Sequence, residues 1–90
     1  MTAMTTTALP SGQWTLLYTA SGDITITLQN QTPASSIKVR IGASAATTDA
    51  LTSAADVVQP YEVRALTLAN GDKVIAAPVQ AIAGAVNIRA

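Results

Sequence analysis

The chain has 90 residues, of which 49% are hydrophobic and 11% are charged, and its formal net charge is zero. This length accommodates one small domain, and the even balance of charge argues against a nucleic-acid-binding surface. Cysteine and histidine are absent, which excludes disulfides, thiolate chemistry and every catalytic triad that requires an imidazole. Because ordinary globular domains are about 25% charged, the low charged fraction favours a surface that is buried between subunits.

Residues 1–12 are rich in Thr and Ala and show no regular hydrophobic period. We expect a flexible N-terminal arm here, followed by a single β domain over residues 13–90. The arm lacks a basic region followed by a long apolar stretch, so we expect no signal peptide, and we expect no membrane span. The part of the arm around Leu9 and Pro10 is a candidate for contact with a partner subunit.

The first strand is predicted at residues 13–19, where Trp14, Leu16 and Tyr18 share one face. Two interpretations of the aromatic pair remain open. Trp14 and Tyr18 align with Leu16, which favours packing in the core. Alternatively, the same two side chains form a platform on which a sugar ring stacks.

Two alternating stretches are the most regular part of the chain. Residues 24–29 and 37–41 alternate apolar with polar side chains, the pattern of strands with one buried and one wet face. The apolar set is Ile24, Ile26, Leu28, Ile37, Val39 and Ile41. A loop over residues 31–35, centred on Pro33, separates the two stretches, and we therefore predict a central hairpin.

Residues 43–56 contain many Ala, Ser and Thr and lack the apolar stripe of a stable helix. We predict a long surface loop with Leu51 as its single large apolar side chain. Loops of this length in small domains are often interaction sites, so Leu51 is a candidate partner contact. An oxygen-only calcium site formed by Asp49 and Asp56 is an alternative role, although no known calcium-loop motif is present.

The second half of the chain contains further strand signals. Residues 57–60 end in Pro60 and indicate an edge strand. Residues 61–69 form a strand whose imperfect alternation suggests a bulge near Arg64 and Ala65. The Asn70-Gly71 pair is a strong hairpin signal.

After this turn, residues 73–77 form the return strand, which residues 80–83 could continue beyond Pro78. Residues 85–90 form the last strand, with Val86 and Ile88 facing inward. Six to eight short strands with turns between them predict an all-β fold, namely a small antiparallel β-sandwich or jelly-roll-like barrel.

The charged residues do not form a catalytic pattern. The acids are Asp23, Asp49, Asp56, Glu62 and Asp72. The aspartates fall in predicted turns or in the long loop, where stabilisation of the turn is the simpler role. Lys38 and Arg40 point the same way from one strand, either as solvated residues that discourage aggregation or as partners for acids of a neighbouring subunit. We therefore expect no enzyme activity, no cofactor and no metal.

Several segments resemble small β-sandwich virion proteins of tailed bacteriophages. They are residues 13–30 (QWTLLYTASGDITITLQN), 39–42 (VRIG), 68–78 (LANGDKVIAAP) and 86–90 (VNIRA). In that family, a first strand with Trp, a second strand that ends in Asn and a Gly-Asp-Lys-Val turn recur. The resemblance covers about residues 13–90 and rests on strand and turn patterns.

The resemblance implies a structural protein, often trimeric, with no catalytic residues to transfer. We expect a capsid decoration (cement) protein that is made in the host cytoplasm, lies on the virion surface and binds the major capsid protein. A homotrimer would also provide buried area that 90 residues lack. The alternatives are a tail or head-fibre attachment subunit and a carbohydrate-binding β module.

Overall fold

The computed structural model describes residues 5–32, 35–51, 54–79 and 83–89. These residues form eight strands and no helix, and hence no helix that could cross a membrane. The strands are β1 (Thr5–Leu9), β2 (Thr15–Thr19), β3 (Ile24–Asn30), β4 (Ile37–Gly42), β5 (Asp56–Val58), β6 (Val63–Leu68), β7 (Lys73–Pro78) and β8 (Gly84–Arg89).

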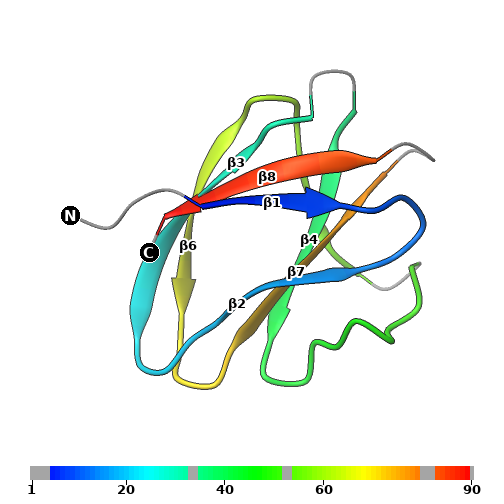
Figure 1. Cartoon of the computed structure of the whole chain (residues 1–90). Coiled ribbons are helices and arrows are strands. Elements are labelled where there is room, and N and C mark those ends of the chain that lie inside the picture. Colours follow the sequence, from blue (N-terminus) through cyan, green and yellow to red (C-terminus); the bar gives the residue numbers. More distant parts are fainter. Residues whose placement is uncertain (1–4, 33–34, 52–53, 80–82, 90) are drawn as a thin grey trace.

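The strands form two four-stranded antiparallel sheets that pack face to face (Figure 1). Sheet A has the order β1-β8-β3-β6 and sheet B the order β2-β7-β4-β5. Each connection crosses from one sheet to the other, except that between β4 and β5. This strand order is that of an eight-stranded jelly roll, and the predicted all-β sandwich is confirmed.

The core lies between the two sheets and contains mostly aliphatic side chains. Its buried members are Leu9, Ala20, Ile26, Leu28, Ile37, Val39, Val58, Leu66, Leu68, Val74, Ala76, Val86 and Ile88. The alternation of β3 explains the pattern, because Ile26 and Leu28 point inward while Thr25 and Thr27 point outward. Val86 and Ile88 face inward from β8, as predicted.

The predicted central hairpin is wrong. Strands β3 and β4 were expected to pair, but β3 bonds to β6 and β8, whereas β4 bonds to β5 and β7. The two strands therefore face each other across the core, with Leu28 and Ile37 in the same buried cluster. Of the connecting loop, Pro33 and Ala34 lie outside the described residues.

The Asn70-Gly71 turn also connects strands of different sheets, so the predicted hairpin does not form there. The amide of Asp72 donates to the carbonyl of Ala69 at 3.0 Å, which closes a four-residue turn. Gly71 has φ of 90°, whereas Asn70 has no positive φ. A hairpin turn of type I′ needs positive φ at both residues, and this combination is that of type II.

The expectation of an arm over residues 1–12 is wrong for residues 5–9. They form β1, an edge strand of sheet A that pairs with β8 in a regular register from Thr5↔Ile88 to Leu9↔Gly84. Residues 1–4 lie outside the described residues. The strand escaped notice because four of its five residues are small or polar and only Leu9 is fully buried.

The predicted bulge in β6 is also wrong, because β6 pairs with β3 without a register shift. The imperfect alternation arises because Arg64, and not Val63, faces inward, opposite Leu28. The bulge lies instead in β2, between Leu16 and Tyr18. Strand β5 is an edge strand, as predicted, and residues 80–82 lie outside the described residues.

Candidate functional site

The outer face of sheet B is partly covered by the chain itself, although Leu16 of β2 and Val57 of β5 remain 47% and 45% exposed. The segment that joins β4 to β5 (residues 43–55, of which 52 and 53 are not described) lies over this face. It forms a second small cluster in which Ala45, Ile75 and Ala77 are buried with Trp14, and Ala55 packs against them. Trp14 is only 3% exposed and is therefore a packed residue with no free ring face for a sugar. The predicted common face of Trp14, Leu16 and Tyr18 is wrong, because β2 shifts register between Leu16 and Tyr18, and Tyr18 packs against the core between the sheets.

Two cationic side chains of β4 attach this segment. Lys38 donates from Nζ to the carbonyl of Leu51 at 2.6 Å, and Arg40 donates from Nη1 to the carbonyl of Ala54 at 3.0 Å. Arg40 also pairs through Nε with Asp49 at 2.9 Å. Neither cation is therefore the freely solvated residue that the sequence suggested.

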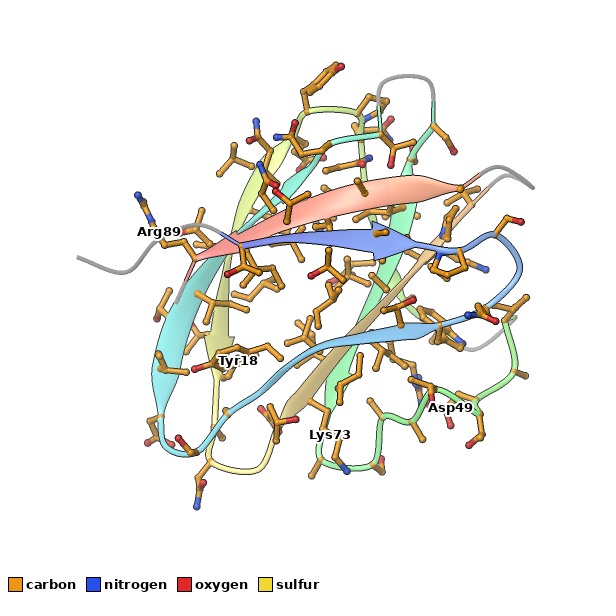
Figure 2. The ribbon with its side chains drawn as sticks, viewed as in Figure 1. Tyr18, Asp49, Lys73 and Arg89 are labelled. Atoms are coloured by element: carbon orange, nitrogen blue, oxygen red, sulfur yellow. The ribbon has the colours of Figure 1, made fainter. Side chains whose placement is uncertain are left out.

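Asp49, labelled in Figure 2, closes its own turn as well as pairing with Arg40. Its carboxylate accepts a hydrogen bond from the amide of Ala46 at 3.0 Å. This backbone bond and then the Arg40 guanidinium stabilise the ionised form, so the pKa of Asp49 lies below its usual value. The predicted role in turn stabilisation is confirmed for Asp49, and equally for Asp72, which accepts from the amide of Ala69.

A buried asparagine organises one end of the sandwich. Asn30 is fully buried, and its side-chain amide donates to the carbonyls of Ser35 and Val58 at 3.0 and 3.1 Å. Its side-chain oxygen accepts from the amide of Thr32 at 2.8 Å, and its main-chain oxygen accepts from the amide of Tyr61. Asn30 thereby fixes two connections, β3–β4 through Thr32 and Ser35 and β5–β6 through Val58 and Tyr61, and its side-chain NH2 group uses both of its donors.

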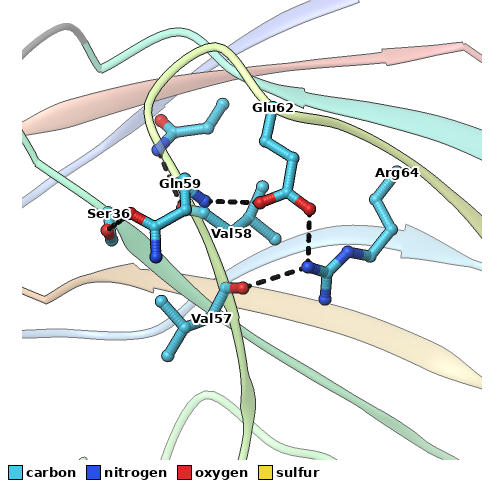
Figure 3. A network of polar contacts seen from close by, with 7 residues as sticks. Ser36, Val57, Val58, Gln59, Glu62 and Arg64 are labelled. Carbon is cyan, nitrogen blue, oxygen red and sulfur yellow. Dashed lines mark hydrogen bonds and ion pairs between the residues drawn. The ribbon is translucent and has the colours of Figure 1, made fainter.

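A polar network continues from this end to the edge where β5 meets β6 (Figure 3). Glu62 accepts from the amide of Gln59 at 2.9 Å and pairs with Arg64 at 2.7 Å. Arg64 also donates to the carbonyl of Val57 and so links the two sheets. The backbone bond from Gln59, followed by the bond from Arg64, lowers the pKa of Glu62 below its usual value.

In contrast to sheet B, sheet A has an outer face that no described segment covers. We call it the open face. Its outward side chains are Thr6, Ala8, Thr25, Thr27, Gln29, Val63, Ala65, Thr67, Ala85, Asn87 and Arg89. Arg89 is the one charged member, and no described ion pair involves it. Figure 2 shows its side chain directed away from the sandwich.

The open face has a regular arrangement because the strand registers align its side chains in rows. Thr27 lies between Ala65 of β6 and Arg89 of β8, and Gln29 lies between Val63 and Asn87. Four strands of about six residues give a footprint of about 19 by 20 Å, or about 400 Å². A flat, nearly uncharged surface of this kind can accept another protein surface with little desolvation of charge.

The predicted contact residues do not form one site. Leu9 is fully buried in the core between the sheets, so the expectation that it contacts a partner is not supported by its position. Pro10 is exposed just after β1. Leu51 is 37% exposed and lies in the segment that covers sheet B, on the other side of the sandwich from β1.

Sequence reasoning missed two exposed apolar side chains at the β6 edge of sheet A, the edge farthest from β1. Tyr61 is 54% exposed and Val63 is 58% exposed, the two highest values among the large exposed hydrophobic residues. The sequence placed Tyr61 at the start of a strand over residues 61–69, whereas Tyr61 lies in the turn between β5 and β6, which begins only at Val63.

No catalytic or metal-binding arrangement occurs within the described residues. None of them belongs to a group of three or more carboxylates that could hold a metal ion. A hollow of about 330 Å³ is lined by Val39, Arg40, Ile41, Ala54, Ala55 and Asp56. Its cation, Arg40, is already engaged by Asp49 and Ala54, so the hollow offers no unpartnered pair of groups for acid–base chemistry.

The chain was compared with known proteins at three levels. No family model matches it, no curated protein matches it in sequence, and no solved structure matches it.

Proposed function

We propose that this chain is a virion structural protein of a tailed bacteriophage, which decorates the assembled capsid by docking the open face on a capsid subunit. The observation that carries the proposal is the asymmetry of the two sheets. The β4–β5 segment covers the part of sheet B around Trp14, Ile75 and Ala77, whereas the outer face of sheet A is regular, nearly uncharged and uncovered by any described residue.

The chemistry of the open face favours a protein surface as the occupant. Its threonine, alanine, glutamine and asparagine side chains offer hydrogen bonds and small apolar contacts. Its one cation, Arg89, would pair with a single carboxylate on the partner surface. The partner surface would therefore be flat and largely neutral. Binding only the assembled shell would stabilise that shell by mass action.

A tail or head-fibre attachment subunit would use the same face on a different virion component, and it remains the alternative. The carbohydrate-binding alternative loses its main support, because Trp14 is buried beneath the β4–β5 segment. A homotrimer belongs to the proposal as well. Native mass spectrometry of the purified protein measures that state, and a monomer at working concentration would contradict it.

Co-sedimentation with capsids that lack this protein tests the proposal. We expect saturable binding with a stoichiometry that matches the symmetry of the shell. Ala65→Glu places a charge at the centre of the open face and is expected to weaken binding at least tenfold. Ala54→Glu, at an alanine that is also solvent-exposed but lies in the β4–β5 segment over sheet B, serves as the control. Absence of saturable binding by the unmodified protein would refute the proposal.

A further inference from the structure

The backbone of Tyr61 has an unusual conformation. Tyr61 has φ of 60°, and it is the one non-glycine residue with positive φ in the described part of the chain. A bulky side chain is disfavoured in this left-handed region, which Gly, Asn and Asp adopt far more readily. Residues held in such conformations are concentrated at functional sites, where the surrounding structure maintains the strain.

The surrounding contacts hold Tyr61 by its main chain and leave its ring free. The amide of Tyr61 donates to the carbonyl of Asn30 at 2.8 Å, and its carbonyl accepts from Nε2 of Gln29 at 3.2 Å. In contrast, no hydrogen bond of the hydroxyl group occurs among the described residues, and 54% of the residue is exposed. The ring is thus presented to solvent on a fixed backbone.

Val63, two residues further along the chain, provides a second exposed apolar side chain at this margin. It pairs across the strands with Gln29, the same residue that binds the Tyr61 carbonyl, so Gln29 connects the strand position of Val63 to the main chain of Tyr61. The only nearby charges along this stretch are those of Glu62 and Arg64, which neutralise each other at 2.7 Å. The Tyr61–Val63 patch therefore has no net charge.

We propose that Tyr61 and Val63 anchor the docked capsid subunit by entering an apolar depression on its surface, with the Tyr61 hydroxyl bonded to a polar group at the rim. This inference rests on the proposed function and names the residues that would contribute most of the free energy of capsid binding. Rigid aromatic residues that enter pockets are the usual hot spots of protein interfaces. Tyr61, which lies outside the open face as defined above, also enlarges the contact, since the open face alone gives about 400 Å² against the roughly 800 Å² per partner of a standard interface.

Three variants test the inference in the same co-sedimentation experiment. Tyr61→Asn removes the ring but suits the left-handed backbone, and Val63→Thr keeps the shape of the side chain while making it polar. We expect Tyr61→Asn to weaken capsid binding at least 30-fold and Val63→Thr about fivefold. Leu16→Asn alters an apolar side chain that is 47% exposed on sheet B, and it should leave binding unchanged.

The thermal unfolding midpoint separates an anchor from a structural residue. We expect Tyr61→Asn to retain or raise the midpoint, because Asn relieves the backbone strain. A clear fall of the midpoint would show that the ring supports the fold and would overturn the inference. Unchanged capsid binding by Tyr61→Asn would overturn it too, while leaving the proposed function intact.

Two further outcomes identify other occupants of the patch. If Tyr61→Asn changes the oligomeric mass and not capsid binding, a second copy of the chain occupies the patch. If it abolishes binding to a host polysaccharide and not to capsids, the ring binds sugar. Either result overturns the inference. Failure of the unmodified protein to bind capsids refutes the proposed function, and the inference with it.

Discussion

The ammonium group of Lys38 lies 5.7 Å from the centre of the Trp14 ring, on the outer side of sheet B. The same ammonium group donates to the carbonyl of Leu51, while the indole nitrogen of Trp14 donates to the carbonyl of Ala50 at 3.3 Å. Two side chains that contact each other thus hold consecutive carbonyls of the β4–β5 segment. This arrangement converts an outer sheet face into a small second core.

Trp14 is the only tryptophan of the chain, so its fluorescence reports on this second core. We expect blue-shifted emission and weak quenching by acrylamide. Lys38→Met should increase the quenching and destabilise the fold by about 1–2 kcal/mol, since it removes a cation–π contact and a charged hydrogen bond. Lys73→Met, at a lysine for which no hydrogen bond is described, is the control. Equal quenching in both variants would contradict the predicted role of Lys38.

The buried amide of Asn30 gives a second prediction. Asn30→Ala leaves the carbonyls of Ser35 and Val58 without their donors, and we expect a loss of about 2–4 kcal/mol in urea unfolding because several buried groups become unsatisfied. Asn30→Asp places a carboxyl group against two carbonyls, which raises the pKa of that carboxyl in the folded state. The stability of this variant should therefore fall as the pH rises, and a pH-independent loss would contradict the assignment.

The sequence predicted most strands, because alternation shows directly which residues face the core. It did not predict how the strands pair. Ile26 and Ile37 face a common core whether β3 and β4 form a hairpin or oppose each other in two sheets, so alternation alone does not distinguish these arrangements. The Asn70-Gly71 signal failed for a related reason. It predicts a turn, but the strands on either side of this turn pair with other strands in different sheets, and Asn70 lacks the positive φ of a type I′ hairpin turn.

The candidate site was harder to predict than the fold. The open face is visible in sequence only as the polar half of each alternating strand, and whether anything covers it depends on the path of the β4–β5 segment. The exposed ring of Tyr61 was not predicted. Tyr61 is the third residue of a turn that the amide of Glu62 closes on the carbonyl of Gln59 at 3.0 Å, and Asn30 and Gln29, which are remote in sequence, also bond its main chain. Leu9 was placed in an arm because an edge strand with a single buried residue shows no alternation of apolar and polar residues in its sequence.

The two lowered pKa values predict how stability depends on pH. The pKa values of Asp49 and Glu62 are lower in the folded state than their usual values. The stability that these two carboxylates contribute is therefore fully present above the usual carboxyl pKa values of about 4. It is lost as the pH falls through their lower pKa values in the folded protein. We expect the thermal midpoint to drop between pH 5 and pH 2.5, and to drop less in Asp49→Asn with Glu62→Gln. An unaltered drop in that double variant would contradict the assignment.

The contact between Gly84 of β8 and Thr32 of the β3–β4 connection gives the last prediction. A Cβ atom added to Gly84 would overlap Oγ1 of Thr32, which accepts a hydrogen bond from the amide of Ala85 at 3.0 Å. We expect Gly84→Ala to destabilise the fold by about 1–3 kcal/mol in urea unfolding, because either the loop or the end of β8 must shift.

The double variant tests this cause. Thr32→Ala alone should be destabilising, since it removes the acceptor for Ala85. Combined with Gly84→Ala, it removes the overlapping oxygen, so the double variant should lose less stability than the sum of the two single variants. Additive losses would mean that the Gly84→Ala effect arises from the backbone of β8 and not from Thr32. Gly84 pairs with Leu9 of β1, so a shift of β8 in Gly84→Ala should also increase hydrogen exchange in β1. If the overlap with Thr32 is the cause, the double variant should return the exchange of β1 toward that of the unmodified protein.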